Sequence, residues 1–127
     1  MLVVSIPQYV QGLTNAKADL TTTDVTTIYT APATADFNAS VINSIIVSND
    51  SGSGDTITLT VTDGASAIFS LFQVKAVAAN TSIELLTRDL ILQSGEIIKA
   101  TAATANRLHI VASIQEFALH RSPQSAF

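Results

Sequence analysis

Strict alternation between threonine and apolar residues, from Thr56 to Thr62, constrains the fold of this chain more than any other stretch of its sequence. Ile57, Leu59 and Val61 fall on one face of an extended segment, and the threonines fall on the other. A period of two residues is typical of a β-strand with one face on a core. The segment therefore predicts a half-buried antiparallel strand with a row of threonines on its outer face.

A second alternating segment lies near the end of the chain. Its inward-facing residues are predicted to be Leu108, Ile110, Ala112 and Ile114. Turn-forming residues separate several further β-branched and apolar segments. Together these patterns predict strands over residues 25–31, 41–49, 55–62, 67–77, 83–92, 96–102 and 108–117, with a shorter apolar stretch at 2–6.

Two of these strands have distinctive patterns. Residues 41–49 carry Val41, Ile45 and Val47 on one face, and they are expected to form a hairpin with the next strand through a turn-rich loop. Residues 67–77 are apolar on both faces at their centre. That pattern predicts burial under a second sheet or under a neighbouring subunit.

The number and spacing of the strands indicate the fold class. About eight strands at regular intervals, with no helical periodicity, are typical of a sandwich or barrel. We expect an all-β fold, a single antiparallel two-sheet β-sandwich of which the jelly roll is one form, with extended N- and C-terminal arms. The expected organisation is an N-terminal arm or edge strand over 1–23, a sandwich domain over 24–118 and a C-terminal tail over 119–127.

The low content of charged residues bears on the partners of the chain. The charged fraction is 13%, which is about half the usual level for a globular domain. Such a surface loses less side-chain entropy when it is covered, and it resembles the centre of a protein interface. Association with other protein, including other copies of this chain, is therefore expected. The net charge of −4 and the scattering of the six basic residues argue against nucleic acid.

Other classes are disfavoured by what the sequence lacks. There is no run of about 18 apolar residues, so no membrane partner is expected. The apolar start, MLVVSIP, has no basic region before it and does not predict a signal peptide. The chain has no cysteine, which excludes disulfides and thiolate chemistry.

No catalytic residue, cofactor or metal site is predicted, and an enzyme is not expected. The histidines, His109 and His120, form no metal-binding motif, and the first is expected to be exposed on its strand. The loop 49–55 offers oxygen ligands but lacks the terminal glutamate of a calcium loop, and a polar turn explains the same residues. The carboxylates that a glycosidase would need are each explained as solvent-facing strand or turn positions; they are Glu84, Glu96 and Glu116.

Three stretches carry a resemblance to a known group of proteins. The first is IYTAP at 28–32, the second is SIIVSN at 44–49 followed by a Ser/Gly turn and the threonine-rich strand, and the third is LLTRDLILQSGEIIKA at 85–100. They resemble small β-rich structural proteins of tailed bacteriophages, and the likeness covers about residues 25–117. The N-terminal residues before it and the tail after it align with nothing in that group.

The resemblance implies a virion component without enzymatic activity. The implied role is a capsid decoration (cement) protein, which sits on the shell as a trimer, bridges capsomers and contacts the major capsid protein or other virion structural proteins. The implied location is the virion, and the host cytoplasm during assembly. A head–tail, neck, tail or baseplate component is the alternative, and a receptor- or carbohydrate-binding sandwich module is the second alternative.

The residues expected to contact other subunits or the capsid lie mainly in the arms. An arm that leaves its own domain must bury its apolar residues on a neighbour. The candidate contact residues are Leu2, Val3, Val4, Ile6, Tyr9, Phe37 and Phe127. Phe37 is the main aromatic residue in a predicted loop, over 33–39, so it also gives the main support to glycan binding.

Overall fold

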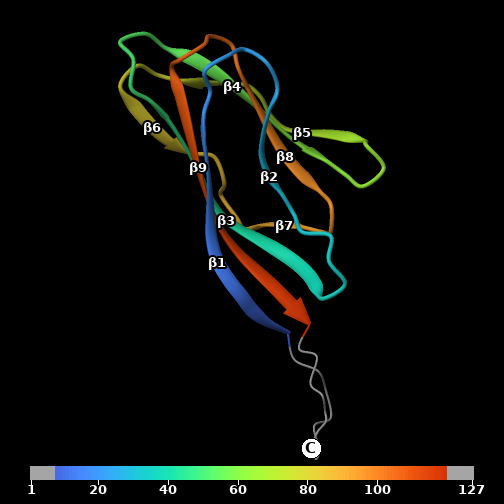
Figure 1. The fold of residues 1–127 in the computed structure, drawn as a ribbon. Helices are drawn as coiled ribbons and strands as arrows, with labels where there is room; N and C mark the ends of the chain where they lie inside the picture. Colours follow the sequence, from blue (N-terminus) through green and yellow to red (C-terminus); the bar gives the residue numbers. More distant parts are fainter. Residues whose placement is uncertain (1–7, 120–127) are drawn as a thin grey trace, which may run out of the picture.

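The computed structural model describes residues 8–119, and every regular element in that range is a β-strand (Figure 1). Sheet A contains, in order, β1 (Gln8–Asp19), β9 (Leu108–Leu119), β3 (Phe37–Asn49) and β6 (Thr81–Glu84), and β7 (Leu90–Leu92) also pairs with β3. Sheet B contains, in order, β2 (Thr26–Thr30), β8 (Ile97–Ala102), β4 (Asp55–Thr62) and β5 (Ile68–Val77). All of these pairings are antiparallel. None of the described residues forms a helix that could span a membrane.

The strand order is that of a jelly roll. Both β6 and β7 pair with β3, so they act as one strand interrupted between Glu84 and Leu90. Counted in this way, the first, eighth, third and sixth strands form one sheet, and the second, seventh, fourth and fifth form the other. This is a two-sheet jelly-roll arrangement with open sheets. The all-β sandwich expected from the sequence is confirmed. Within the predicted N-terminal arm or edge strand over 1–23, residues 8–19 form β1 at the edge of sheet A, whereas residues 1–7 and 120–127 lie outside the described residues.

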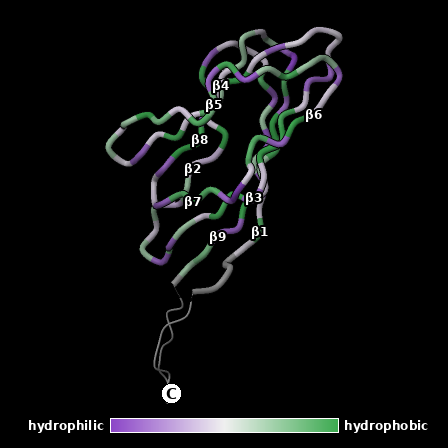
Figure 2. The backbone as a smooth tube through the Cα atoms, turned by 180° about the vertical axis from the view of Figure 1, so that it is seen from behind, coloured by the Kyte–Doolittle hydropathy of each residue, from purple (hydrophilic) through white to green (hydrophobic). Residues whose placement is uncertain are grey.

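The core lies between the inward faces of the two sheets. Apolar residues alternate with polar ones along most strands, as the changes of colour in Figure 2 show. The fully buried side chains include Ile42, Ile45, Val47, Ile57, Leu59, Ile98, Leu108 and Ile110. The predicted inward phases of β4 and β9 are therefore confirmed. The threonine row of β4 faces outward at its first three positions, and Thr62 is buried at its end.

The predicted hairpin between residues 41–49 and 55–62 is wrong, because β3 and β4 lie in different sheets. The loop between them crosses from one sheet to the other. The buried side chain of Asn49 shapes this crossing: its Nδ2 donates to the carbonyl oxygens of Ser53 at 2.8 Å and Val77 at 3.2 Å. Its Oδ1 accepts from the backbone N–H of Ser51 at 3.0 Å. Alternation and turn residues locate strands, but they do not identify the partner of each strand.

The predicted face of β3 is also wrong in part, because the strand contains a bulge. The pairing with β9 shifts between Ile42 and Ser44. Ile42 points into the core before the bulge, and Ile45 does so after it. An extra residue reverses the inward phase of a strand, so Val41 lies on the opposite face from Ile45.

Phe37 lies at the start of β3 rather than in a loop. The predicted loop over 33–39 therefore ends earlier, and the ring of Phe37 is 8% exposed and belongs to the core.

The predicted strand over 83–92 is divided by an excursion between β6 and β7. Glu84 stabilises the chain at this break. Its carboxylate accepts hydrogen bonds from the backbone N–H groups of Ile45 at 2.7 Å and Leu86 at 3.1 Å, and from the hydroxyl of Ser44. The N–H of Leu85 donates to the carbonyl of Ile45 at 2.8 Å. Burial acts to raise the pKa of Glu84, but these hydrogen bonds outweigh it and hold the pKa below its usual value.

Candidate functional site

An exposed apolar edge is the most unusual surface of the described residues. It consists of Ile68, Phe69, Leu71 and Val74, all on β5, with exposed fractions of 66%, 55%, 37% and 61%. β5 is the edge strand of sheet B, beside β4. Four of the nine large hydrophobic residues exposed in the described range therefore lie on a single strand. We call this set the β5 edge.

The inward-facing part of the β5 edge is exposed because sheet A does not extend over it. Phe69 pairs with Val61, which lies on the inward face of sheet B. Paired residues share a face, so Phe69 also points inward, and yet more than half of its surface is exposed. The strand opposite, β6, ends at Glu84, where the chain leaves the sheet. The inward face of sheet B is thus left uncovered beside the end of β6.

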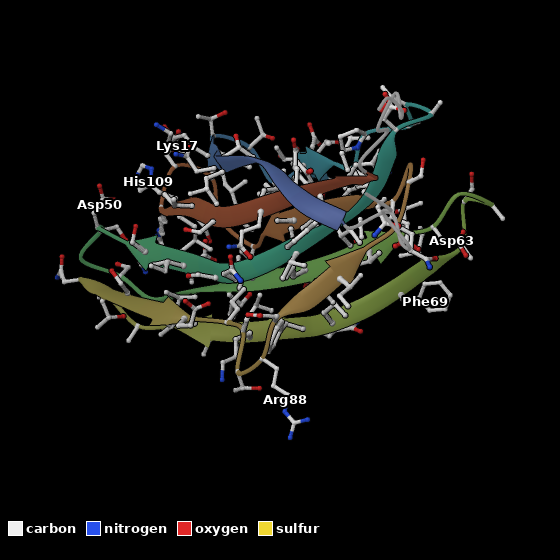
Figure 3. The ribbon with its side chains drawn as sticks, turned by 90° about the horizontal axis from the view of Figure 1, so that it is seen from below. Lys17, Asp50, Asp63, Phe69, Arg88 and His109 are labelled. Carbon is white, nitrogen blue, oxygen red and sulfur yellow. The ribbon has the colours of Figure 1, made fainter. Side chains whose placement is uncertain are left out.

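A shallow open groove adjoins the β5 edge. It measures about 290 Å³ and is lined by Leu71 and Phe72 of β5 and by apolar residues of the segment between β6 and β7; these are Leu85, Leu86 and Leu90. Arg88 and Asp89 also line it. Figure 3 shows Phe69 and Arg88 projecting on the same side of the molecule as β5. We call this feature the β5 groove.

The backbone of β5 is irregular next to the groove. Its pairing with β4 shifts on both sides of Leu59, so extra residues lie in β5 at these points. Val74, a β-branched residue, has a φ of 52° and donates its N–H to Oγ1 of Thr58 at 3.1 Å. A positive φ is costly for such a residue, and bulges disrupt the regular row of backbone groups on an edge strand. The apolar side chains are therefore the main means of recognition that β5 offers.

The outer face of sheet A is a second candidate surface. Ile46 and Val111 are exposed there and are paired in the sheet, and Lys17 and Glu84 flank them in the same row across the strands. A shallow groove on the same sheet is lined by uncharged residues: Leu13, Thr14, Asn15, Asn43, Ser113, Ile114 and Gln115. The lining of this groove matches the charge depletion expected from the composition.

A short polar row lies at one end of that face. His109 of β9 contacts Asp19 through Nδ1 and Asp50 through Nε2, each at 3.2 Å. Figure 3 shows His109 beside Asp50. All three side chains are substantially exposed, so the pairs are solvated and contribute little stability. The two aspartates come from distant parts of the sequence, and no local pattern predicts that they contact this histidine.

The hydroxyl of Tyr29 forms a further polar contact between the two sheets. The hydroxyl of Tyr29, on β2, lies 2.6 Å from Oγ of Ser40 on β3 and donates to Oε2 of Glu116 on β9, also at 2.6 Å. Burial raises the pKa of Tyr29, and the hydrogen bond to Glu116 raises it further. Glu116 is therefore part of an inter-sheet contact, and it is half-buried rather than solvent-facing. No group of three or more metal-ligating side chains gathers within residues 8–119.

The sequence-predicted contact residues are placed only in part. Leu2, Val3, Val4, Ile6 and Phe127 lie outside the described residues, as does His120. Tyr9 lies in β1 opposite Ala118, and Phe37 is buried in the core. The β5 edge is not among the contact residues predicted from the sequence, although the apolar pattern on both faces of residues 67–77 indicated it.

Comparison with known proteins bears on the fold. No protein-family model and no curated protein matches the sequence. A chain in the structure of infectious bursal disease virus, Gx strain, superimposes with a TM-score of 0.50 at 9% identity. The match covers 94% of this chain and 31% of that chain, so this chain spans about a third of the other's length. A chain from the Gt strain aligns at 9% identity over 94% of this chain and 43% of its own, with a TM-score of only 0.26. The similarity to the Gx-strain chain shows a shared fold.

Proposed function

We propose that this protein is a non-enzymatic structural subunit of a virus particle. The observation that carries the proposal is the β5 edge, an apolar strip left uncovered on a jelly roll whose sequence is poor in charge. Soluble monomers rarely expose contiguous apolar surface, and such patches mark sites of association. The similar chain in the structure of infectious bursal disease virus supports this proposal, since a chain of this fold is part of that virus structure.

The specific role proposed is that of a capsid decoration protein of a tailed bacteriophage. In that role the chain forms a homotrimer, contacts the major capsid protein and bridges neighbouring capsomers. The three sequence stretches that resemble phage structural proteins support this assignment. The protein would act in the virion, after folding in the host cytoplasm.

The mechanism of such a protein is thermodynamic rather than chemical. Each bound copy adds interface area between capsomers without any reaction. Anything that binds the assembled state and not the separated parts stabilises the assembly by mass action. The uncharged lining of the groove on sheet A suits this role, because little desolvation of charge opposes its burial.

A location at the head–tail junction, the neck, the tail or the baseplate is the other candidate. It requires the same fold and the same apolar edge, and it differs in symmetry and copy number. A glycan-binding role has less support, because the ring of Phe37 is buried and offers no stacking surface at a loop.

The experiment is quantitative mass spectrometry of virus particles purified from the source of the sequence. A decoration protein is expected to be present in hundreds of copies, in a fixed ratio to the major shell protein. Six or twelve copies would contradict decoration and indicate a connector or baseplate. Absence from purified particles, with the chain present in the infected-cell lysate, would overturn the virion role.

A further inference from the structure

The β5 groove has the properties of a site for an extended apolar segment. It lies between the edge of β5 and the break in sheet A. Leu71 and Phe72 line it on the side of β5, and three leucines line it on the other side, together with Arg88 and Asp89; the leucines are Leu85, Leu86 and Leu90. A strand that enters at a sheet edge presents every second side chain to the same wall. A segment that fits the apolar part of this groove must therefore have apolar residues at alternate positions.

Residues 2–6 of this same chain have that pattern. Their sequence, LVVSI, places Leu2, Val4 and Ile6 on one face of an extended segment. Val3 and Ser5 fall on the other face, and none of the five is charged. The segment comes immediately before Pro7 and β1, and it lies outside the described residues.

The strand order places the groove beyond the reach of this segment within one molecule. β1 is the edge strand of sheet A and contacts β2, whereas β5 contacts β6 at the other edge. β1 and β6 are three strand spacings of about 4.8 Å apart, and the two sheets are separated by about 10 Å. Figure 1 shows the start of β1 at the end of the molecule where β9 finishes, away from β5.

The connection between the segment and β1 is short. Gln8 is fixed in sheet A, where it pairs with Leu119. Only Pro7 separates it from Ile6, and two residues of extended chain span about 7 Å at most. Ile6 therefore cannot lie in the β5 groove of its own molecule while Gln8 remains in its own sheet.

We propose that residues Leu2–Ile6 of one copy lie along β5 of a neighbouring copy, with Leu2, Val4 and Ile6 in the β5 groove. This inference rests on the proposed function to the extent that it names the contact between copies in the assembly. The occupant of the groove is thus a second copy of this chain. The exchange covers the inward face of sheet B beside β6 and removes the apolar lining of the β5 groove from water.

Disulfide trapping tests this contact, because the chain contains no cysteine of its own. A full-length chain carrying Val4→Cys is mixed with a differently tagged full-length chain carrying Leu71→Cys, under mild oxidation. Mixed dimers of Val4→Cys with Ile91→Cys provide the control, since Ile91 is 62% exposed and lies on sheet A. The bound segment raises the effective concentration of the two thiols, so the first pair should cross-link at least about tenfold faster than the control pair.

Each other result identifies a different occupant and overturns the proposal. Equal rates for the two pairs would mean that the segment does not bind β5. Rapid homodimers of Leu71→Cys alone would indicate that two β5 strands meet directly. Faster trapping of Leu71→Cys by a chain with Phe127→Cys would assign the groove to the C-terminal tail. A monomeric intramolecular disulfide in the double variant, at all dilutions, would mean that the segment folds onto its own chain.

A matched pair of charge substitutions tests the face of the segment that binds. Val4→Asp should weaken self-association at least about tenfold, because it would bury a charge in the groove. Val3→Asp is the control, since it adds the same charge on the opposite face and should leave association within about twofold of the unmodified chain. The melting temperature of both variants, measured where the chain is monomeric, verifies that the sandwich is intact. Equal weakening by the two variants would contradict the alternating arrangement.

The failure of this inference is distinguishable from the failure of the proposed function. If the chain is abundant in purified particles but Val4→Cys does not trap Leu71→Cys, the function stands and the exchanged segment is wrong. If trapping is efficient but particles lack the chain, the interface stands and the virion role is wrong.

Discussion

At the scale of single residues, a tyrosine hydroxyl connects the two sheets where the core itself is apolar. Tyr29 is bound to Ser40, which is fully buried, and to Glu116. A buried hydroxyl without a partner costs free energy, so the three groups stabilise one another only as a set. The phenol also fixes how β2 lies across β3 and β9.

Replacing Tyr29 with phenylalanine should remove this connection. We expect Tyr29→Phe to lower the free energy of unfolding by about 1–2 kcal/mol, because the buried hydroxyl of Ser40 loses its partner. Urea denaturation measures the change. A double-mutant cycle with Ser40→Ala isolates the pair, and purely additive effects would contradict the coupling.

Glu84 is an exposed residue whose carboxylate nevertheless makes specific hydrogen bonds to the protein. Its carboxylate accepts three hydrogen bonds at the break between β6 and β7, and its pKa is lowered below the ordinary 4.5. A carboxyl group with a lowered folded pKa stabilises the fold fully above its ordinary value. That stabilisation is lost as the pH falls through the folded pKa.

The substitution Glu84→Gln should therefore have an effect that depends on pH. At pH 7 it should cost about 1 kcal/mol of stability, since a neutral amide accepts the backbone N–H groups less strongly. Below pH 4.5 the difference from the unmodified chain should shrink. Urea titrations at both values measure it, with Asp89→Asn as a control for the change in net charge. A difference that is equal or larger in acid would contradict the role of the carboxylate.

At the scale of elements, the sequence located the strands better than it located their partners. The alternation of residues 56–62 and 108–114 correctly predicts inward and outward faces, because burial leaves a direct mark on residue type. The partners of β3 and β4 depend on the jelly-roll crossing, to which local sequence contributes only a polar loop. The bulge after Ile42 and the break after Glu84 were also missed, since each depends on hydrogen bonds to another segment.

The loop that crosses between the sheets should depend on Asn49. Asn49→Ala should lower the free energy of unfolding by about 2 kcal/mol, because it leaves buried backbone groups near β5 without their partner. Ser53→Ala is the matched control in the same loop, since only the backbone carbonyl of Ser53 accepts from Asn49. Thermal denaturation of the two variants tests this, and an equal loss of stability in both would contradict it.

For the candidate site too, the sequence predicts the strand but not what packs against it. The double-sided apolar pattern of residues 67–77 predicted burial by a second sheet or by another subunit, and the structure leaves Ile68, Phe69 and Val74 exposed within the single chain. The sequence could not choose between the two forms of cover, because that choice depends on where β6 ends. The exposure of β5 appears only when both sheets are in place.

At the scale of the whole molecule, the chain is a jelly roll with one uncovered apolar edge and little surface charge. Closed symmetric assembly is the usual way in which such a surface is covered, and an exchanged segment at each contact generates a ring when the rotation closes. The trimer proposed above would cover this edge and close the ring of exchanged segments. The same surfaces would make an isolated copy prone to uncontrolled association.

Sedimentation velocity of the full-length chain over a wide range of concentration is the most direct test of this account. We expect a single discrete oligomer, a trimer, that dissociates on dilution. Val4→Asp should shift this dissociation to higher protein concentration. A chain that stays monomeric at all concentrations while the β5 edge remains exposed would contradict it.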